Sequence, residues 1–160
     1  MDRIISEKLK KSPESCLPLG PRQVGKSTLI RSLNPDLTIN LSKESEYYRY
    51  TSEPGRLEQL VEAGNFKTIF IDEIQRIPSL LNSVQALIDE SNGRLKFYLS
   101  GSSSRKLRRG HANLLPGRLL VFHMGGLCGA EIPKDTSTTR LLQFGSLPDI
   151  VVHPDNEFCS

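Results

Sequence analysis

Four residues at fixed spacing carry the clearest chemistry in this sequence of 160 residues. Gly20, Gly25, Lys26 and Ser27 fit the pattern G-x-x-x-x-G-K-[ST] of the P-loop, which cradles phosphate groups. A glycine at position 25 lets the backbone approach a phosphate, and the loop N–H groups form an anion nest before the next helix. Lys26 is expected to reach the β- and γ-phosphates, and the Ser27 hydroxyl to complete the coordination of Mg²⁺. The alternative is a turn before a helix, in which Lys26 is only solvated.

An acidic pair, Asp72 and Glu73, follows an apolar run at residues 68–71. Ligands of a parallel α/β sheet bind beyond the carboxyl ends of the strands, so both carboxylates are expected to face the P-loop. One of them can hold Mg²⁺ together with Ser27, and the other can orient an attacking water. The alternative is that the pair only caps the next helix. A P-loop upstream favours the metal and water roles.

Small hydroxyl residues follow the fourth predicted strand, in the segment SGSSS. Either Ser102 or Ser103 is expected to contact the γ-phosphate or the attacking water, and the pattern does not choose between them. A serine-rich turn without a ligand is the alternative.

The densest basic segment of the chain comes next, RKLRRGHANLLPGR. Three roles are open for its basic side chains: a solvated face, a nucleic-acid contact, or arginines presented to a neighbouring subunit's nucleotide. These side chains are Arg105, Lys106, Arg108 and Arg109. Arg118 stands apart, just before the fifth predicted strand. It is expected either to act as a finger on a transferring γ-phosphoryl group or to pair with a local carboxylate.

Strands and helices alternate along the chain, as expected of a parallel α/β sheet. The run at 68–71 is continuously apolar, which is typical of a strand buried on both faces. Pro18 predicts a short or frayed first strand, because proline donates no ladder hydrogen bond. Ser52 is expected to cap the helix that follows it. The predicted strands span 15–19, 37–41, 68–71, 95–100 and 118–124, and the predicted helices 3–11, 26–33, 54–63 and 79–90.

The composition is that of an ordinary globular domain, with 37% hydrophobic and 24% charged residues. A net charge of +3 is too small to imply nucleic acid by itself. No apolar run approaches the length of a membrane span, and the N-terminus has no signal-peptide core, so we expect a cytoplasmic protein without membrane contact. Cys16, Cys128 and Cys159 are odd in number and form no C-x-x-C, which supports neither a disulfide framework nor a zinc site.

The sequence resembles the prokaryotic AAA+-like P-loop ATPases whose C-terminal part is a domain of unknown function. The resemblance rests on four stretches, in this order: GPRQVGKST, FIDEIQRIP, LSGSSSRKLRRGHANLLPGR and FGSLPDIV. It implies a three-layer α/β fold of the ASCE type, with about five parallel strands, helices on both faces, and the fourth strand between the first and the third. ATP is the implied nucleotide, with Mg²⁺, and its implied contacts are Gly20, Pro21, Arg22, Gln23, Val24, Gly25, Lys26, Ser27 and Thr28.

The same resemblance assigns roles to the candidate site residues. Lys26 and Ser27 match the Walker A pair, and Asp72 and Glu73 match the Walker B pair. Ser102 or Ser103 matches the polar sensor of the fourth strand, and Arg118 matches the Gly-Arg that precedes the fifth. The predicted catalytic set is Lys26, Glu73, Ser103 and Arg118, and the predicted metal ligands are Ser27 and Asp72.

The resemblance also divides the chain into a P-loop ATPase domain at 1–125 and a tail at 126–160 that resembles the start of the family's C-terminal region. The sequence stops soon after SLPDIV, where similar proteins continue, so we expect the ATPase domain alone. ATP hydrolysis is the leading expectation. The alternatives are a nucleotide-dependent switch with little turnover and a nucleic-acid-binding regulator. The oligomeric state stays open, a homo-oligomer included.

Overall fold

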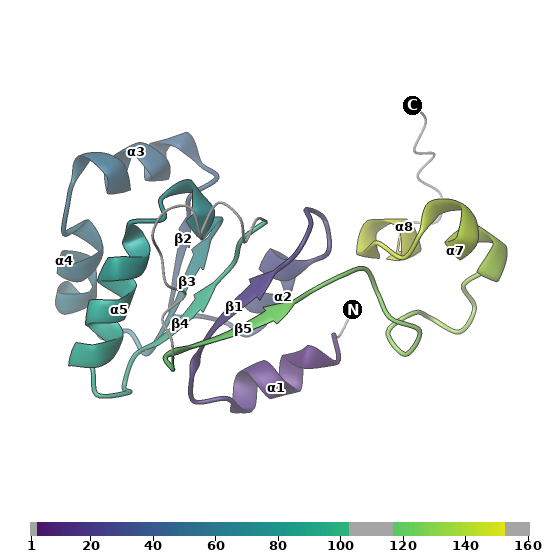
Figure 1. Cartoon of the computed structure of the whole chain (residues 1–160), viewed down its shortest axis with the longest axis horizontal. Helices are drawn as coiled ribbons and strands as arrows, with labels where there is room; N and C mark the ends of the chain where they lie inside the picture. Colours follow the sequence, from purple (N-terminus) through teal and green to yellow (C-terminus); the bar gives the residue numbers. More distant parts are fainter. Residues whose placement is uncertain (1–2, 103–116, 153–160) are drawn as a thin grey trace.

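A five-stranded parallel sheet forms the centre of the computed structural model, which describes residues 3–102 and 117–152 (Figure 1). The strands lie in the order β2-β3-β4-β1-β5, and all neighbours run parallel. Their bounds are Ser15–Leu19 (β1), Leu37–Asn40 (β2), Thr68–Asp72 (β3), Lys96–Leu99 (β4) and Leu119–His123 (β5). β4 therefore lies between β1 and β3, as the resemblance implies.

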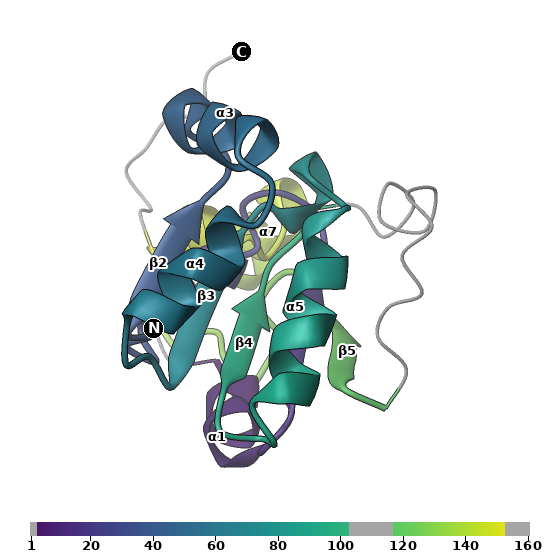
Figure 2. The same ribbon diagram turned by 90° about the vertical axis from the view of Figure 1, so that its left-hand side faces the viewer.

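Helices cover both faces of this sheet (Figures 1 and 2). α3, α4 and α5 pack on one face, and α1 and α2 pack on the other. The helices are Ile5–Lys11 (α1), Lys26–Arg31 (α2), Glu44–Ser52 (α3), Arg56–Ala63 (α4), Leu80–Glu90 (α5), Thr138–Phe144 (α7) and Pro148–Val152 (α8), with a 3-10 turn at Ile74–Arg76 (η1). This arrangement confirms the predicted three-layer P-loop fold. Within the described parts of the chain, no helix combines the length and apolar character needed to cross a membrane.

The strands build two cores because successive side chains point to opposite faces. On β3, Ile69 and Ile71 pack with α3, α4 and α5, whereas Phe70 packs with α1 and α2. β4 repeats the pattern with Phe97 on the first face and Tyr98 on the second. The apolar run at 68–71 therefore fills both cores, as its sequence predicted.

Two local predictions were wrong. β1 is neither short nor frayed: all five residues of Ser15–Leu19 are buried, and Pro18 stays in register with Phe122 of β5. Proline removes one donor, but β1 still pairs with β5 along all five of its residues. Ser52 does not cap the helix after it but ends α3, where its hydroxyl donates to Tyr48 O at 2.7 Å. α4 begins after Gly55, whose φ of 83° suits a residue without a Cβ.

Gly20 lies where β1 turns into the P-loop, against the end of β5. Met124 N donates to Leu19 O at 2.7 Å, which brings the two backbones together. A Cβ on Gly20 would lie only 2.1 Å from Met124 O. The first glycine of the P-loop pattern is therefore required here by the close approach of β5.

The tail contacts the N-terminal segment through a largely buried ion pair. Arg3 Nε lies 3.4 Å from Glu131 Oε1, and Arg3 Nη2 donates to Gly125 O at 3.0 Å. The backbone N–H groups of Ile4 and Cys128 donate to the two oxygens of Glu131 at 2.9 and 3.1 Å. The division at residue 125 stays a prediction, but residues on either side of it are joined here.

The Glu131 carboxylate has a lowered pKa in this setting. Burial raises the pKa, but the N–H groups of Cys128 and Ile4 and the charge of Arg3 outweigh it and bring it below the ordinary 4.5. A lowered carboxyl pKa stabilises the fold above its ordinary value, and the contribution disappears as the pH falls through the lowered value.

We predict that Glu131→Gln lowers the free energy of unfolding at pH 7 by about 1–2 kcal/mol, because a charge-assisted contact is lost. The difference from wild type should narrow as the pH falls below the ordinary value of 4.5 and through the lowered value, where the carboxylate of the folded protein is protonated as well. Urea unfolding at a series of pH values measures this. The matched control is Glu7→Gln on α1, whose carboxylate pairs with Lys11 at the exposed surface. A constant difference at all pH values, or an equal cost in the control, would contradict the prediction.

Candidate functional site

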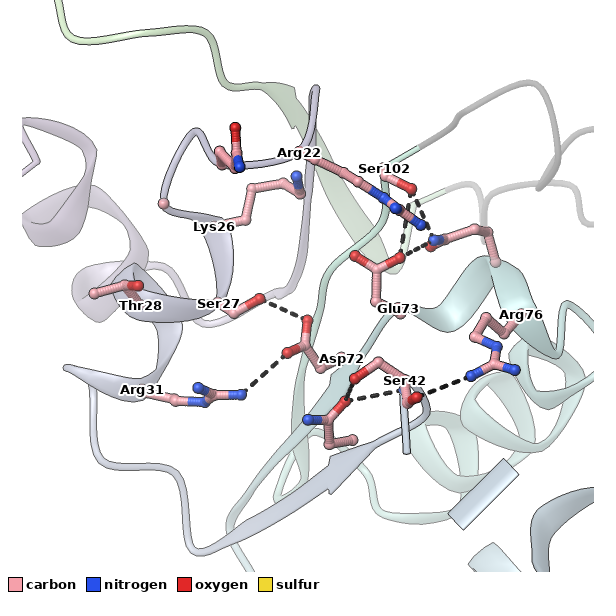
Figure 3. A pocket seen from close by; sticks show the side chains of 14 residues that line it. Arg22, Lys26, Ser27, Thr28, Arg31, Ser42, Asp72, Glu73, Arg76 and Ser102 are labelled. Atoms are coloured by element: carbon pink, nitrogen blue, oxygen red, sulfur yellow. Dashed lines mark hydrogen bonds and ion pairs between the residues drawn. The ribbon is translucent and has the colours of Figure 1, made fainter. Parts of the chain in front are cut away.

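A cavity of about 670 Å³ lies at the carboxyl ends of β1, β2 and β3, lined by the P-loop and the acidic pair (Figure 3). Among its lining side chains are four cations and two carboxylates: Arg22, Lys26, Arg31, Arg76, Asp72 and Glu73. An excess of positive charge in a concave site favours an anionic ligand.

The P-loop curves around one side of this cavity. Gln23 and Gly25 have φ values of 67° and 85°, in the left-handed region that gives an anion nest its concave shape. Between them, Val24 is buried and packs with the core beneath α1 and α2. The loop is therefore fixed from below while its backbone faces the cavity. α2 starts at Lys26, so its amino end points at the same space.

Lys26 is held by the loop to which it belongs. Its Nζ donates to Gly20 O at 2.8 Å and Pro21 O at 2.6 Å. Burial lowers the pKa of its ammonium, although the charges of Glu73 and Asp72 oppose this shift. A phosphate would offer this partly desolvated cation a stronger partner than two carbonyl oxygens.

Asp72 ends β3 and is 4% exposed. Its Oδ1 accepts hydrogen bonds from the Ser27 hydroxyl at 2.7 Å and from the Ser100 hydroxyl. Its Oδ2 lies 3.3 Å from Arg31 Nη2. The buried carboxylate is thus satisfied by the P-loop helix on one side and by the end of β4 on the other.

Glu73 takes part in a second network. Its backbone is left-handed, with φ 60°, and starts η1, which turns Gln75 back toward it. Gln75 Nε2 donates to Glu73 Oε2 and, at 2.9 Å, to the Ser102 hydroxyl. The Glu73 N–H donates to Ser100 Oγ at 3.2 Å, so Ser100 contacts both acidic residues. Figure 3 shows Arg22, Glu73 and Ser102 among the side chains that line this cavity.

The structure brings most of the predicted site residues to one cavity: Arg22, Gln23, Gly25, Lys26, Ser27, Thr28, Asp72, Glu73 and Ser102. Gly20, Pro21 and Val24, which were also predicted, do not line it. Ser103 and the basic residues Arg105, Lys106, Arg108 and Arg109 lie outside the described residues. The choice between Ser102 and Ser103 and the nucleic-acid contact therefore stay predictions.

Arg118 lies at the amino ends of the strands, whereas its own P-loop lies at their carboxyl ends. It precedes Leu119, which pairs with Ser15 at the start of β1, whereas the P-loop follows the other end of that strand. Its Nε contacts Asp89 Oδ1 near the end of α5. This is the local pairing that the sequence left open, and a role at a neighbour's nucleotide stays a prediction.

Three residues that contact the acidic pair were missed in the sequence. Ser100 follows β4 directly, two positions before Ser102. Arg31 lies four residues after Ser27, and this spacing places both side chains on one side of a helix. The spacing could therefore have indicated that Arg31 contacts the same acidic residue as Ser27. No sequence pattern marked Gln75, because its side chain reaches Glu73 only through the left-handed turn at Glu73.

The oxygen atoms at this site fit a Mg²⁺ ion shared with phosphates. Ser27 and Asp72 supply a hydroxyl and a carboxylate, the hard ligands that Mg²⁺ prefers, and the ion usually completes its shell with water and substrate oxygens. In the described ranges 3–102 and 117–152, no cluster of three or more His, Cys, Asp or Glu could hold a metal by itself.

Comparison with known proteins gives a family match and several relatives. A family model described as an AAA domain matches residues 13–132. Uncharacterised proteins of Mycobacterium tuberculosis and Mycobacterium bovis are each 30% identical over 141 residues, which cover 86% of this chain. The chain spans only 31% of the length of these curated relatives.

Similar solved structures include PCH-2 of C. elegans, with a TM-score of 0.49 and 19% identity over 76% of this chain and 39% of that one. Another is a DNA replication initiation factor, with a TM-score of 0.45 and 10% identity over 75% of this chain and 44% of that one.

We predict that Ser100→Ala lowers the free energy of unfolding by about 1–3 kcal/mol, because two buried groups lose a partner: the Asp72 carboxylate and the Glu73 N–H. Thermal or urea unfolding measures the loss. Ser42→Ala is the matched control, since this serine lines the same cavity but is exposed, and its hydroxyl donates to Asn40 rather than to an acidic residue. Equal stability of the two variants would show that Ser100 is not the link between the acidic residues.

Proposed function

Because the chain belongs to the family of AAA domains, which are nucleotide-binding domains of the ATPase type, we propose that it binds ATP and hydrolyses it at the P-loop cavity. The observation that carries the proposal is the Ser27–Asp72 hydrogen bond of 2.7 Å, which joins the P-loop to the acidic pair. It aligns the residues that would hold phosphates with those that would act on water.

The proposed roles follow from the position of each side chain. Lys26 exchanges its carbonyl partners for the β- and γ-phosphates, and Ser27 and Asp72 hold Mg²⁺. Bound Mg²⁺ would neutralise charge that develops on the phosphates. Glu73 accepts a proton from a water whose oxygen attacks the γ-phosphorus, and the bond from that phosphorus to the β–γ bridging oxygen breaks. The products are ADP and inorganic phosphate.

A nucleotide-dependent switch with little turnover is the second candidate. It is favoured by the position of α8, because a Cβ on Gly25 would lie 3.6 Å from Pro148 Cγ. Leu147 also packs with the core that contains Val24. A tail in contact with the P-loop can change its position when a phosphate binds, and this requires no hydrolysis.

Two variants test binding and hydrolysis separately. Lys26→Ala should weaken ATP affinity by about tenfold to a hundredfold, because a charge-assisted contact is lost. Glu73→Gln should bind ATP at least as well as wild type but hydrolyse it about a hundredfold or more slowly. Calorimetric titration with ATP and phosphate release measure the two effects.

The control for Lys26→Ala is Lys10→Ala on α1, an exposed lysine outside the cavity. Asp72→Asn should instead lose the tightening of ATP binding by Mg²⁺. Unchanged affinity in a folded Lys26→Ala variant would remove the binding proposal. Negligible wild-type turnover with intact binding would leave the switch.

We also propose that the chain forms a homo-oligomer in which Arg118 acts on a neighbour's γ-phosphate. Its position away from its own P-loop supports this, and the side chain would have to exchange Asp89 for the phosphate. A finger of this kind contributes about 10³-fold or more to turnover.

If Arg118 acts in trans, activity per subunit should rise with protein concentration, and Arg118→Ala mixed with Lys26→Ala should regain activity. Asp89→Asn is the control for the local role, because it removes the same ion pair and leaves the arginine. A loss in Asp89→Asn equal to that in Arg118→Ala, without rescue on mixing, would assign Arg118 to the local contact.

A further inference from the structure

One ion pair connects the end of the helix after the P-loop with the acidic residue that ends β3. Arg31 is the last residue of α2 and lies one turn after Ser27. Its Nη2 lies 3.3 Å from Asp72 Oδ2. Figure 3 shows Ser27 and Arg31 meeting the same carboxylate from the side of α2.

The two oxygens of Asp72 have different partners. Oδ1 accepts from the hydroxyls of Ser27 and Ser100. Oδ2 accepts from the Arg31 guanidinium. A Mg²⁺ ion beside Ser27 would keep several waters, and these waters need acceptors. Oδ1 already accepts from two hydroxyls, so Oδ2 is the oxygen left to receive them, and the guanidinium covers it.

We propose that Arg31 is a built-in competitor of Mg²⁺ for the Asp72 carboxylate, and that it raises the Mg²⁺ concentration at which the site loads. This inference rests on the proposed function, because it requires Mg²⁺ to bind beside Ser27. A guanidinium and a divalent ion at one carboxylate repel each other, so the arginine opposes binding of the metal.

The surroundings of Arg31 permit this exchange. Its side chain is 53% exposed, whereas that of Asp72 is 6% exposed. Arg31 also lines a second cavity of about 600 Å³ beside β2, where the carboxylate of Glu46 is already paired with Arg49. A guanidinium that leaves Asp72 therefore has solvent and an open cavity in its surroundings. Because the guanidinium is half exposed, water screens its attraction to the carboxylate, and a divalent ion can replace it.

Two other roles for Arg31 predict different results. An arginine that contacts phosphate would weaken nucleotide binding when removed, even at saturating Mg²⁺. An arginine that only supports the fold would cost the same stability with and without Mg²⁺. A competitor, in contrast, stabilises the protein only at low Mg²⁺, because it is then the counter-ion of Asp72.

The test uses Arg31→Met and ADP as the nucleotide, with thermal unfolding followed across a range of MgCl₂ concentrations. The MgCl₂ concentration that gives half of the rise in melting temperature should fall about twofold to fivefold. The melting temperature without MgCl₂ should also fall, and ADP affinity at saturating MgCl₂ should match wild type. Arg31→Gln, a second uncharged variant, decides the matter if Arg31→Met does not fold.

Arg49→Met is the matched control. Arg49 is 49% exposed, pairs with Glu46 at 3.0 Å and lines the same second cavity, so its removal changes the charge equally without touching Asp72. It should keep the wild-type midpoint. An equal shift in this control, weaker ADP binding in Arg31→Met at saturating MgCl₂, or an unchanged midpoint in both Arg31 variants would overturn the inference alone. A wild type whose ADP binding ignores MgCl₂ would instead remove the metal role in the proposed function.

Discussion

The buried carboxylate of Asp72 is the constraint on which the arrangement of the site depends. A charge removed from water costs several kcal/mol unless other groups of the protein take the place of water. Here those groups come from separate parts of the chain: Ser27 and Arg31 on α2, and Ser100 after β4. They meet only if β4 lies between β1 and β3, which is the observed order. The observed strand order and the pairing of the buried Asp72 carboxylate therefore depend on each other.

The parts of the site that could be predicted are those that local geometry fixes. The P-loop spacing describes a single turn of backbone, so four residues sufficed to locate it. Asp72 and Glu73 could be placed because a buried strand must end somewhere and its carboxyl end faces the ligand. Gln75 could not be placed, since its contact with Glu73 follows from a left-handed residue that no sequence pattern marks.

The helices and strands likewise divide into those that the local sequence predicts and those that depend on tertiary contacts. Apolar runs located all five strands, but α3 was missed because its sequence ESEYYRYTS is largely polar. The start of that helix is fastened from elsewhere: Arg76 donates to Leu41 O at 2.8 Å, pairs with Glu44 and lies over the Tyr47 ring. The prediction from Pro18 failed for a related reason, because β5 pairs with β1 along all five residues although one donor is absent.

The close approach of Gly20 to Met124 has a mechanical consequence. Backbone touches backbone at this point, and a hydrogen bond of 2.7 Å joins Leu19 to Met124 with no side chain between them. Close-packed protein has low compressibility and transmits strain. β5 continues directly into the segment that carries α7 and α8. A displacement of the phosphate loop at Gly20 would therefore pass to the segment that carries α7 and α8 through the backbone contact at the end of β1.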